Sequence, residues 1–97
     1  MNKPKYGIVS TSQFNKEVKL AKKRGYDISL LRNVVQMLAN GEKLDPKYKD
    51  HALLGRWIKY TDCRECHITP DWLLIYKISE ENLFFYLVRT GTHSDLF

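Results

Sequence analysis

All three histidines of this 97-residue chain lie near side chains that can move a proton or hold a phosphate. His67 comes four residues before Asp71, His93 comes four residues after Arg89, and His51 directly follows an aspartate. Imidazole can serve as a general acid or base near neutral pH, and arginine offers phosphate a planar fork of donors. Together these side chains suit metal-free RNA cleavage, in which the RNA's own 2′-hydroxyl attacks the neighbouring phosphate. A single histidine is more often an ordinary surface residue, so the prediction depends on their clustering.

The stretch "CRECH" at residues 63–67 also matches motifs for haem attachment, zinc binding and dithiol chemistry. Covalent haem needs an exported protein, and the N-terminus lacks the apolar segment of a signal peptide. Zinc needs four ligands, yet the odd spacing of Cys63 and Cys66 puts them on opposite faces of a predicted strand. A redox dithiol normally lies at the start of a helix in a βαβ unit, which the pattern does not predict. We therefore expect both cysteines to be small apolar packing residues.

The positive charge of the chain is concentrated near its N-terminus. The net charge is +5, of which residues 1–24 contribute +6 and the remainder −1. The plain interpretation is a solvated helix face, but such a surface also attracts polyanions and predicts contacts with nucleic acid. The predicted RNA-binding residues are Lys16, Lys19, Lys22, Lys23 and Arg24.

Length and composition predict one domain, residues 1–97, in the cytoplasm. The chain is 43% hydrophobic, which is enough for a single core. It contains no apolar run long enough to cross a bilayer, so we expect a cytoplasmic protein with reduced thiols. It also contains no glycine-rich phosphate-binding loop, which leaves nucleotide hydrolysis and dinucleotide binding unsupported.

The hydrophobic pattern predicts an α+β fold. Helical periodicity predicts helices at about 12–24 and 28–39, with Thr11 or Ser12 and then Asp27 as N-caps. Residues 42–55 read as a loop, and residues 91–97 as a short tail. Runs rich in β-branched and aromatic residues predict four strands, at residues 6–10, 56–68, 71–78 and 83–90. The predicted layout is an N-terminal strand, two antiparallel helices, and a twisted antiparallel meander with the helices on one face.

Two tight turns would bring the polar side chains together. If Ile68 pairs with Asp71, and Ser79 pairs with Asn82, then His67, Trp72 and Arg89 form one row across three strands. Because a slip of one residue turns every side chain to the other face, this row depends on both turn lengths.

Three blocks of the sequence together resemble one family of bacterial toxins. The blocks "YKDHALLG", "CHITPDWLLIYKI" and "VRTGTHSDLF" resemble the YafQ-type branch of the RelE/ParE superfamily, the toxins of type II toxin–antitoxin modules. The resemblance implies a small RelE-like α+β fold. It also implies an endoribonuclease that cuts mRNA in the decoding site of a translating ribosome, with no metal and no cofactor.

The resemblance also assigns roles to the residues. It implies an acid–base set of His51, His67, Asp71 and His93. We expect His93 to be the general acid, with Asp71 or His67 near the attacking hydroxyl. Arg89 would stabilise the phosphate, and Phe97 would orient the RNA or pack beside His93. Trp72 is expected to be structural rather than a stacking platform for bases.

The last two strands read as apolar on both faces, so a partner is expected on the face that helices leave open. The family resemblance implies an acidic, partly disordered antitoxin that wraps this basic chain, alongside the ribosome and mRNA as partners, and no membrane. Two alternatives stay open. One is a toxin of the same fold that inhibits DNA gyrase by binding it, and the other is a basic RNA-binding domain without catalysis.

Overall fold

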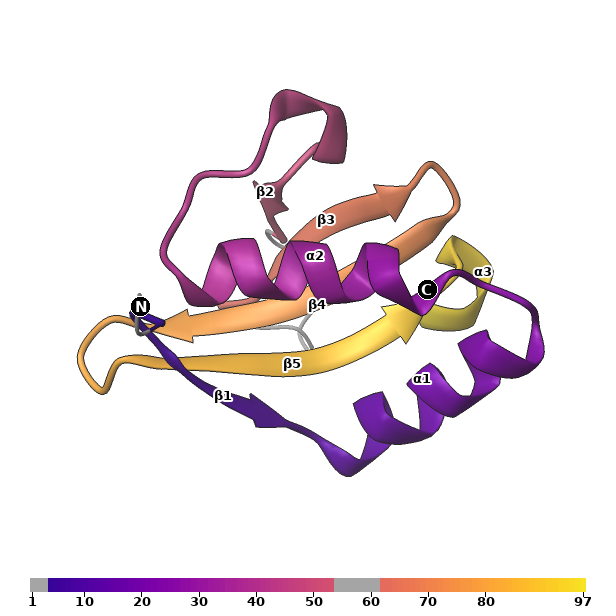
Figure 1. Cartoon of the computed structure of the whole chain (residues 1–97), viewed down its shortest axis with the longest axis horizontal. Coiled ribbons are helices and arrows are strands. Elements are labelled where there is room, and N and C mark those ends of the chain that lie inside the picture. Colours follow the sequence, from indigo (N-terminus) through magenta and orange to yellow (C-terminus); the bar gives the residue numbers. More distant parts are fainter. Residues whose placement is uncertain (1–3, 54–61) are drawn as a thin grey trace.

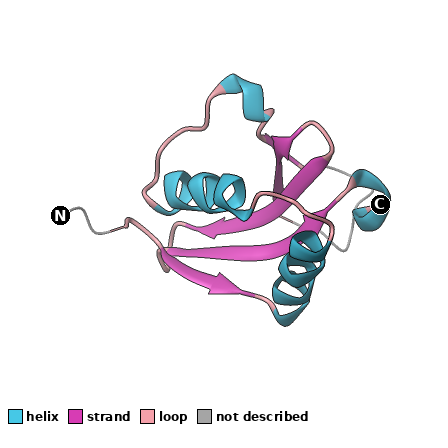
Figure 2. Ribbon diagram, turned by 45° about the vertical axis from the view of Figure 1, so that its right-hand side comes forward, coloured by secondary structure: helices cyan, strands magenta, loops and turns pink. Residues whose placement is uncertain are grey.

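The computed structural model describes residues 4–53 and 62–97, which form a five-stranded sheet with helices packed on it (Figures 1 and 2). In their order across the sheet the strands are β1 (Gly7–Ser10), β5 (Phe84–Gly91), β4 (Trp72–Ser79), β3 (Arg64–Thr69) and β2 (His51–Ala52). Strands β3 to β5 form an antiparallel meander, as predicted, and β2 extends it from a segment that was expected to be a loop. Strand β1 pairs with β5 in the parallel direction. The sheet is therefore mixed, and the predicted α+β fold class is confirmed.

The two predicted helices are present as α1 (Ser12–Lys23) and α2 (Ile28–Ala39). Thr11 and Asp27 cap them, since each side-chain oxygen accepts a hydrogen bond at 3.0 Å from a main-chain N–H of the first turn. Gly25, with a φ of +82°, turns the chain from the end of α1 toward α2, which crosses in front of the sheet in Figure 1. None of the described helices is long and apolar enough to cross a bilayer.

Apolar side chains are buried on both faces of the sheet. On the face toward α1 and α2, the core includes Leu74, Tyr76 and Phe85. On the opposite face, Leu73 and Ile75 pack with other side chains in a second cluster that includes the C-terminal helix. The alternation follows from the strand period of two residues, so β4 supplies both cores.

Trp72 is a packing residue, as predicted. Its side chain is buried, and its indole Nε1 donates a hydrogen bond to Thr90 Oγ1 at 2.9 Å. The ring also lies 5.0 Å from that of Tyr26, measured between centroids. Buried in this way, the indole has no free face on which a nucleotide base could stack.

The predicted row of His67, Trp72 and Arg89 is wrong, because both turns differ from the expected lengths. The first hairpin closes with Thr69 opposite Trp72, and an irregularity then places His67 opposite Leu73. The second hairpin closes with Ser79 opposite Phe84, and a further shift places Arg89 opposite Ile75. These bulges change which residues share a face, so His67 lies on the face of Leu73 rather than that of Trp72.

Three short elements occur where a loop or a tail was expected. The expected loop over 42–55 contains the 3-10 helix η1 (Pro46–Tyr48) and strand β2, and the expected tail contains helix α3 (His93–Leu96). Of the strand expected over 56–68, β3 (Arg64–Thr69) forms the C-terminal part. Residues 54–61 lie outside the described residues. Strand β2 carries His51 and helix α3 carries His93, so these two elements matter for the site.

The register between β4 and β5 can be tested with two neighbouring phenylalanines. Phe85 is fully buried and its ring meets that of Tyr76 edge-on at 5.5 Å, whereas Phe84 is 42% exposed. We expect Phe85→Ala to lower the free energy of unfolding by roughly 3–5 kcal/mol in urea denaturation, because it leaves a cavity in the core. Phe84→Ala is the control and should cost on the order of 1 kcal/mol. Equal losses at the two positions would contradict the observed register.

Candidate functional site

A buried carboxylate lies between two of the histidines. Glu65 is 5% exposed and faces His51, its partner across β2 and β3, and His67, two residues along β3 on the same face. Its Oε1 atom lies 3.6 Å from His51 Nε2 and 3.5 Å from His67 Nε2. Because an unpaired buried carboxylate is costly, the two imidazoles are the partners that this position requires. We call these three residues the His–Glu–His cluster.

Main-chain carbonyl groups fix the orientation of both rings. His51 Nδ1 lies 2.7 Å from the carbonyl oxygen of Lys49, and His67 Nδ1 lies 3.3 Å from that of Pro70. In each ring the other nitrogen, Nε2, faces Glu65, so only a protonated ring can donate to both the carbonyl oxygen and the carboxylate. Uptake of a second proton by either ring therefore places positive charge beside the carboxylate, as a general base requires.

The residue before His51 attaches β2 to the sheet. Asp50 accepts a hydrogen bond from the hydroxyl of buried Tyr76 and forms an ion pair with Arg64, whose Nη2 lies 3.1 Å from Asp50 Oδ2. These contacts join the short strand to β3 and β4 directly beside the cluster. His51 is therefore positioned by its neighbour as well as by strand pairing.

Helix α3 brings a third histidine to the cluster. A hollow of about 140 Å³ is lined by His51, Leu53, Glu65, His93 and Phe97. The rings of His93 and Phe97 lie 5.0 Å apart, as expected for residues four apart on a helix. The structure thus brings together four of the predicted site residues, because His67 contacts the same Glu65 carboxylate.

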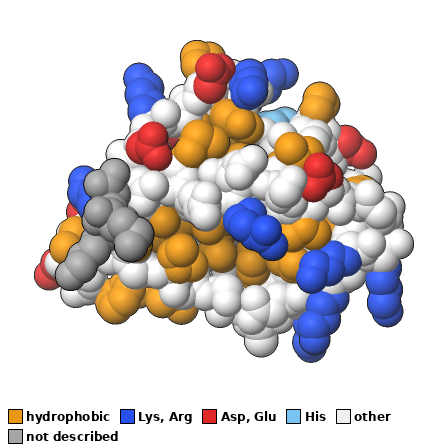
Figure 3. Space-filling model, in the orientation of Figure 1, with side chains coloured by type: hydrophobic (Ala, Val, Ile, Leu, Met, Phe, Trp, Pro, Cys, Tyr) orange, Lys and Arg blue, Asp and Glu red, His pale blue; other side chains and the backbone are white. Residues whose placement is uncertain are grey.

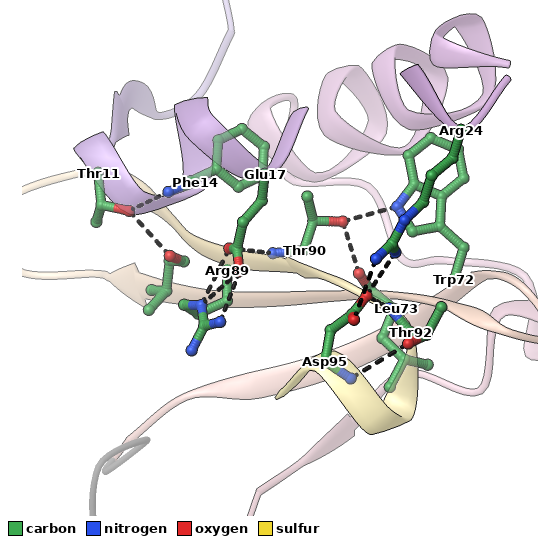
Figure 4. Close-up of polar contacts among 11 residues, drawn as sticks. Thr11, Phe14, Glu17, Arg24, Trp72, Leu73, Arg89, Thr90, Thr92 and Asp95 are labelled. Atoms are coloured by element: carbon green, nitrogen blue, oxygen red, sulfur yellow. Dashed lines mark hydrogen bonds and ion pairs between the residues drawn. The ribbon is translucent and has the colours of Figure 1, made fainter. Parts of the chain in front are cut away.

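Two contacts of one carboxylate hold α3 in place (Figure 4). Asp95 and Thr92 form a capping box, in which Asp95 Oδ2 accepts from the Thr92 N–H at 2.9 Å. The same oxygen lies 2.7 Å from Arg24 Nη1 at the end of α1. The Arg24 guanidinium, together with the Thr92 N–H, holds the pKa of Asp95 far below its usual range. Arg24, predicted as an RNA-binding residue, is thus engaged in a contact within the protein.

Asp71 lies elsewhere, whereas Arg89 is two strands from Glu65 in the same cross-strand row, through Ile75. Asp71 is exposed at the tip of the β3–β4 hairpin, and Arg89 contacts Glu17 of α1, with 2.6 Å between Nη2 and Oε2. Glu17 also accepts from the main-chain N–H of Thr90 at 3.1 Å, so this contact joins α1 to β5. Among the described residues, the lining of the hollow includes neither Asp71 nor Arg89. Their roles in catalysis stay predictions.

The four predicted lysines of α1 are exposed, and Figure 3 shows basic side chains gathered at the lower right, where α1 lies. These lysines are Lys16, Lys19, Lys22 and Lys23. Their contact with RNA stays a prediction.

Glu65 was missed by the sequence reasoning. Its signal was present, since an acidic residue two positions before a histidine in a strand shares the histidine's face. The prediction considered only Cys63, Cys66 and His67 in this stretch. Cys63 and Cys66 are free, buried thiols in the two different cores, and burial raises the pKa of Cys66 to about 12. Within residues 4–53 and 62–97, no group of three or more His, Cys, Asp or Glu side chains is arranged to hold a metal ion.

The attachment of α3 can be tested by removing its carboxylate. We expect Asp95→Ala to speed amide hydrogen exchange at Leu96 and Phe97, because the capping box and the contact with Arg24 are both lost. The pKa of Asp95 is lowered in the folded protein, so its contribution is complete above about pH 4 and declines as the pH falls further.

The exposed neighbour Ser94 provides the control. Ser94→Ala should leave exchange at both amides unchanged. If Asp95→Ala also left the exchange rates unchanged at neutral pH, the carboxylate would not be what holds α3.

Comparison with known proteins places the chain in a family. Residues 6–97 match the family described as the bacterial toxin of type II toxin–antitoxin systems, YafQ. The mRNA interferase toxin YafQ of Escherichia coli K12 is 44% identical over 91 residues, which cover 93% of this chain and 94% of the relative.

Solved structures agree with this assignment. The E. coli DinJ–YafQ toxin–antitoxin complex contains a chain that is 39% identical, with a TM-score of 0.84, and the match covers 96% of this chain and 98% of that one. A metal-bound toxin from Helicobacter pylori is 44% identical with a TM-score of 0.86, over 95% of this chain and 99% of that one. The chain therefore belongs to the YafQ family of toxins from bacterial type II toxin–antitoxin systems, whose curated E. coli members are mRNA interferases.

Proposed function

We propose that this toxin is an endoribonuclease that cleaves mRNA on the translating ribosome by metal-free acid–base catalysis. The observation that carries the proposal is the His–Glu–His cluster, with His93 and Phe97 completing the adjoining hollow. Inhibition of gyrase by binding, or RNA binding alone, would not require two imidazoles at one buried carboxylate and a third lining the adjoining hollow. The family assignment also favours cleavage, because the curated relatives are mRNA interferases.

In the proposed reaction, the cluster supplies the base and α3 supplies the acid. His67 accepts the proton of the 2′-hydroxyl as the O2′ atom bonds to phosphorus. The bond from phosphorus to the 5′-oxygen breaks, and His93 donates a proton to that oxygen. The products are a 2′,3′-cyclic phosphate and a 5′-hydroxyl. Glu65, 3.5 Å from His67 Nε2, stabilises the charge that this ring gains.

The other predicted residues have supporting roles in this proposal. His51 shares the Glu65 carboxylate, and Phe97 packs against His93 so that the acid keeps its orientation. We retain Arg89 as the residue that would stabilise the phosphate, and Asp71 as an alternative base. Both proposals rest on the family resemblance, since the structure places these side chains outside the cluster.

The basic face of α1 would bind ribosomal RNA. Its lysines are exposed and belong to the segment of residues 1–24, which carries +6. A concentrated positive charge of this kind speeds association with polyanions and weakens with salt. The toxin would therefore act in the cytoplasm, where ribosomes translate.

An antitoxin is the second proposed partner, as in the E. coli complex of DinJ with YafQ, and we expect it to be acidic. Apolar side chains remain exposed along β1 and the β4–β5 hairpin, namely Ile8, Val9, Leu83 and Phe84. Figure 3 shows hydrophobic side chains gathered at the lower left, where these elements lie. A partly disordered acidic segment could cover such a patch while its charge complements the +5 of the toxin.

The nuclease proposal predicts a large loss of activity in His93→Ala. We expect the rate of cleavage of ribosome-bound mRNA to fall roughly 10²–10⁴-fold, the usual contribution of one general acid. The measurement is single-turnover cleavage with mapping of new 5′ ends. Glu65→Gln should also lower the rate at saturating toxin, because it removes the charge that supports His67 and His51.

Two exposed residues provide matched controls for these variants. Ser94→Ala lies beside His93, and Glu81→Gln removes a carboxylate from the β4–β5 hairpin. Both should cleave as the unsubstituted toxin does. If His93→Ala cut mRNA at the same sites and rates as its control, the proposed acid would be wrong.

Metal-free catalysis predicts that chelation leaves the activity intact. Toxin dialysed against EDTA should cleave ribosome-bound mRNA at the rate of untreated toxin, provided that Mg²⁺ is restored for the ribosome before the assay. The test has weight because a relative from H. pylori is described as metal-bound. Loss of activity that Zn²⁺ or Cu²⁺ restores would contradict the metal-free scheme.

A further inference from the structure

A larger hollow lies beside the His–Glu–His cluster. It measures about 450 Å³, within the range of ligand sites, and opens between η1, α2 and the edge of β3. Strand β2 pairs with the start of β3, at Arg64 and Glu65, whereas the later residues 67–69 of β3 line the hollow. The 3-10 helix η1 also contacts β3. The side chains around the hollow include Leu30, Tyr48 and Pro70.

The lining combines an apolar surface with a positive rim. Lys47 and Lys49 belong to the lining, and Lys47 Nζ lies 5.2 Å from the centre of the Tyr48 ring. None of the described residues that line the hollow is acidic. Grooves that bind single-stranded nucleic acid use the same combination, in which bases stack on aromatic or apolar side chains and lysines attract the backbone.

His67 connects this hollow to the cluster. It belongs to the lining, and its Nε2 atom lies 3.5 Å from Glu65 Oε1. The end of η1 is joined to the cluster as well, because His51 Nδ1 lies 2.7 Å from the carbonyl oxygen of Lys49. A strand of RNA with its reactive phosphate at His67 would therefore have an adjacent nucleotide over the hollow.

A neighbouring hollow is acidic where the first is basic. It measures about 250 Å³, shares Leu30 and Thr69 with the first, and is lined by Asp27 and Asp71. Phosphates would be repelled by Asp27 and attracted by Lys47 and Lys49. The backbone should therefore follow the η1 side, with the base directed toward α2.

We propose that this hollow binds the base of the nucleotide next to the cleaved phosphate and so contributes to the sequence preference of the toxin. Tyr48 and Leu30 would contact the base, while Lys47 and Lys49 would contact phosphate. The inference rests on the proposed nuclease activity. An acidic segment of the antitoxin is the competing occupant, but RNA is favoured because His67 lies in both the hollow and the cluster.

The experiment measures cleavage of ribosome-bound mRNAs that differ in the nucleotide on either side of the cut. We expect Tyr48→Leu, which keeps an apolar side chain, to reduce the rate differences among the four bases at one flanking position. Leu30→Asp is a second variant at a site already 39% exposed, and it should lower the cleavage rate by placing negative charge in the hollow. Thermal unfolding checks that each variant is folded.

Two lysine variants distinguish the loss of one phosphate contact from the loss of positive charge in general. Lys47→Gln should weaken binding similarly for all mRNAs and reduce the slope of log affinity against log salt by about one. Lys43→Gln, which removes an exposed lysine outside the hollow, should leave the slope and the base preference unchanged.

The outcomes distinguish the two proposals. If unsubstituted toxin does not cleave ribosome-bound mRNA, the nuclease proposal fails and the inference fails with it. If unsubstituted toxin cleaves, but folded Tyr48→Leu, Leu30→Asp and Lys47→Gln keep its rates and base preference, the inference alone is overturned. Variants that lose affinity for the antitoxin while cleaving normally would assign the hollow to the peptide, which also overturns it.

Discussion

The site depends on one constraint, which is that Glu65 is buried between two imidazoles. A carboxylate in this position is stable only with partners, and the structure supplies them from β2 and from its own strand. The same arrangement that stabilises the charge also orients Nε2 of His51 and His67 toward the carboxylate. Folding and the proposed chemistry therefore share one set of contacts, which the short elements near the site keep in place.

The elements that carry the histidines are short, so long-range contacts must position them. Strand β2 has two residues and is attached through Asp50 to Tyr76 and Arg64, while α3 has four residues and is attached through Asp95 to Arg24. Neither element could be stable alone, because a strand or helix of this length makes too few hydrogen bonds to offset the cost of ordering its backbone. The sheet and α1 thus act as the rigid frame on which the site is built.

Local pattern predicted the long elements well, because apolar periodicity and caps such as Thr11 and Asp27 depend only on residues that are close in sequence. It failed where geometry depends on distant residues. His67 and Arg89 leave the predicted row because of two turn lengths and two bulges, which the pattern leaves open. The engagement of Arg24 by a residue near the other end of the chain, and the burial of Glu65, likewise required the folded structure.

The central claim is that the RNA's own 2′-hydroxyl is the nucleophile and that the His–Glu–His cluster activates it. The most direct test uses an mRNA with a single 2′-deoxynucleotide immediately 5′ of the scissile phosphate, bound to the ribosome and mixed with excess toxin. The account predicts no cleavage at that position, with intact cleavage of the all-ribose mRNA to a 2′,3′-cyclic phosphate. Cleavage of the deoxy-substituted mRNA at the same position and rate would contradict it.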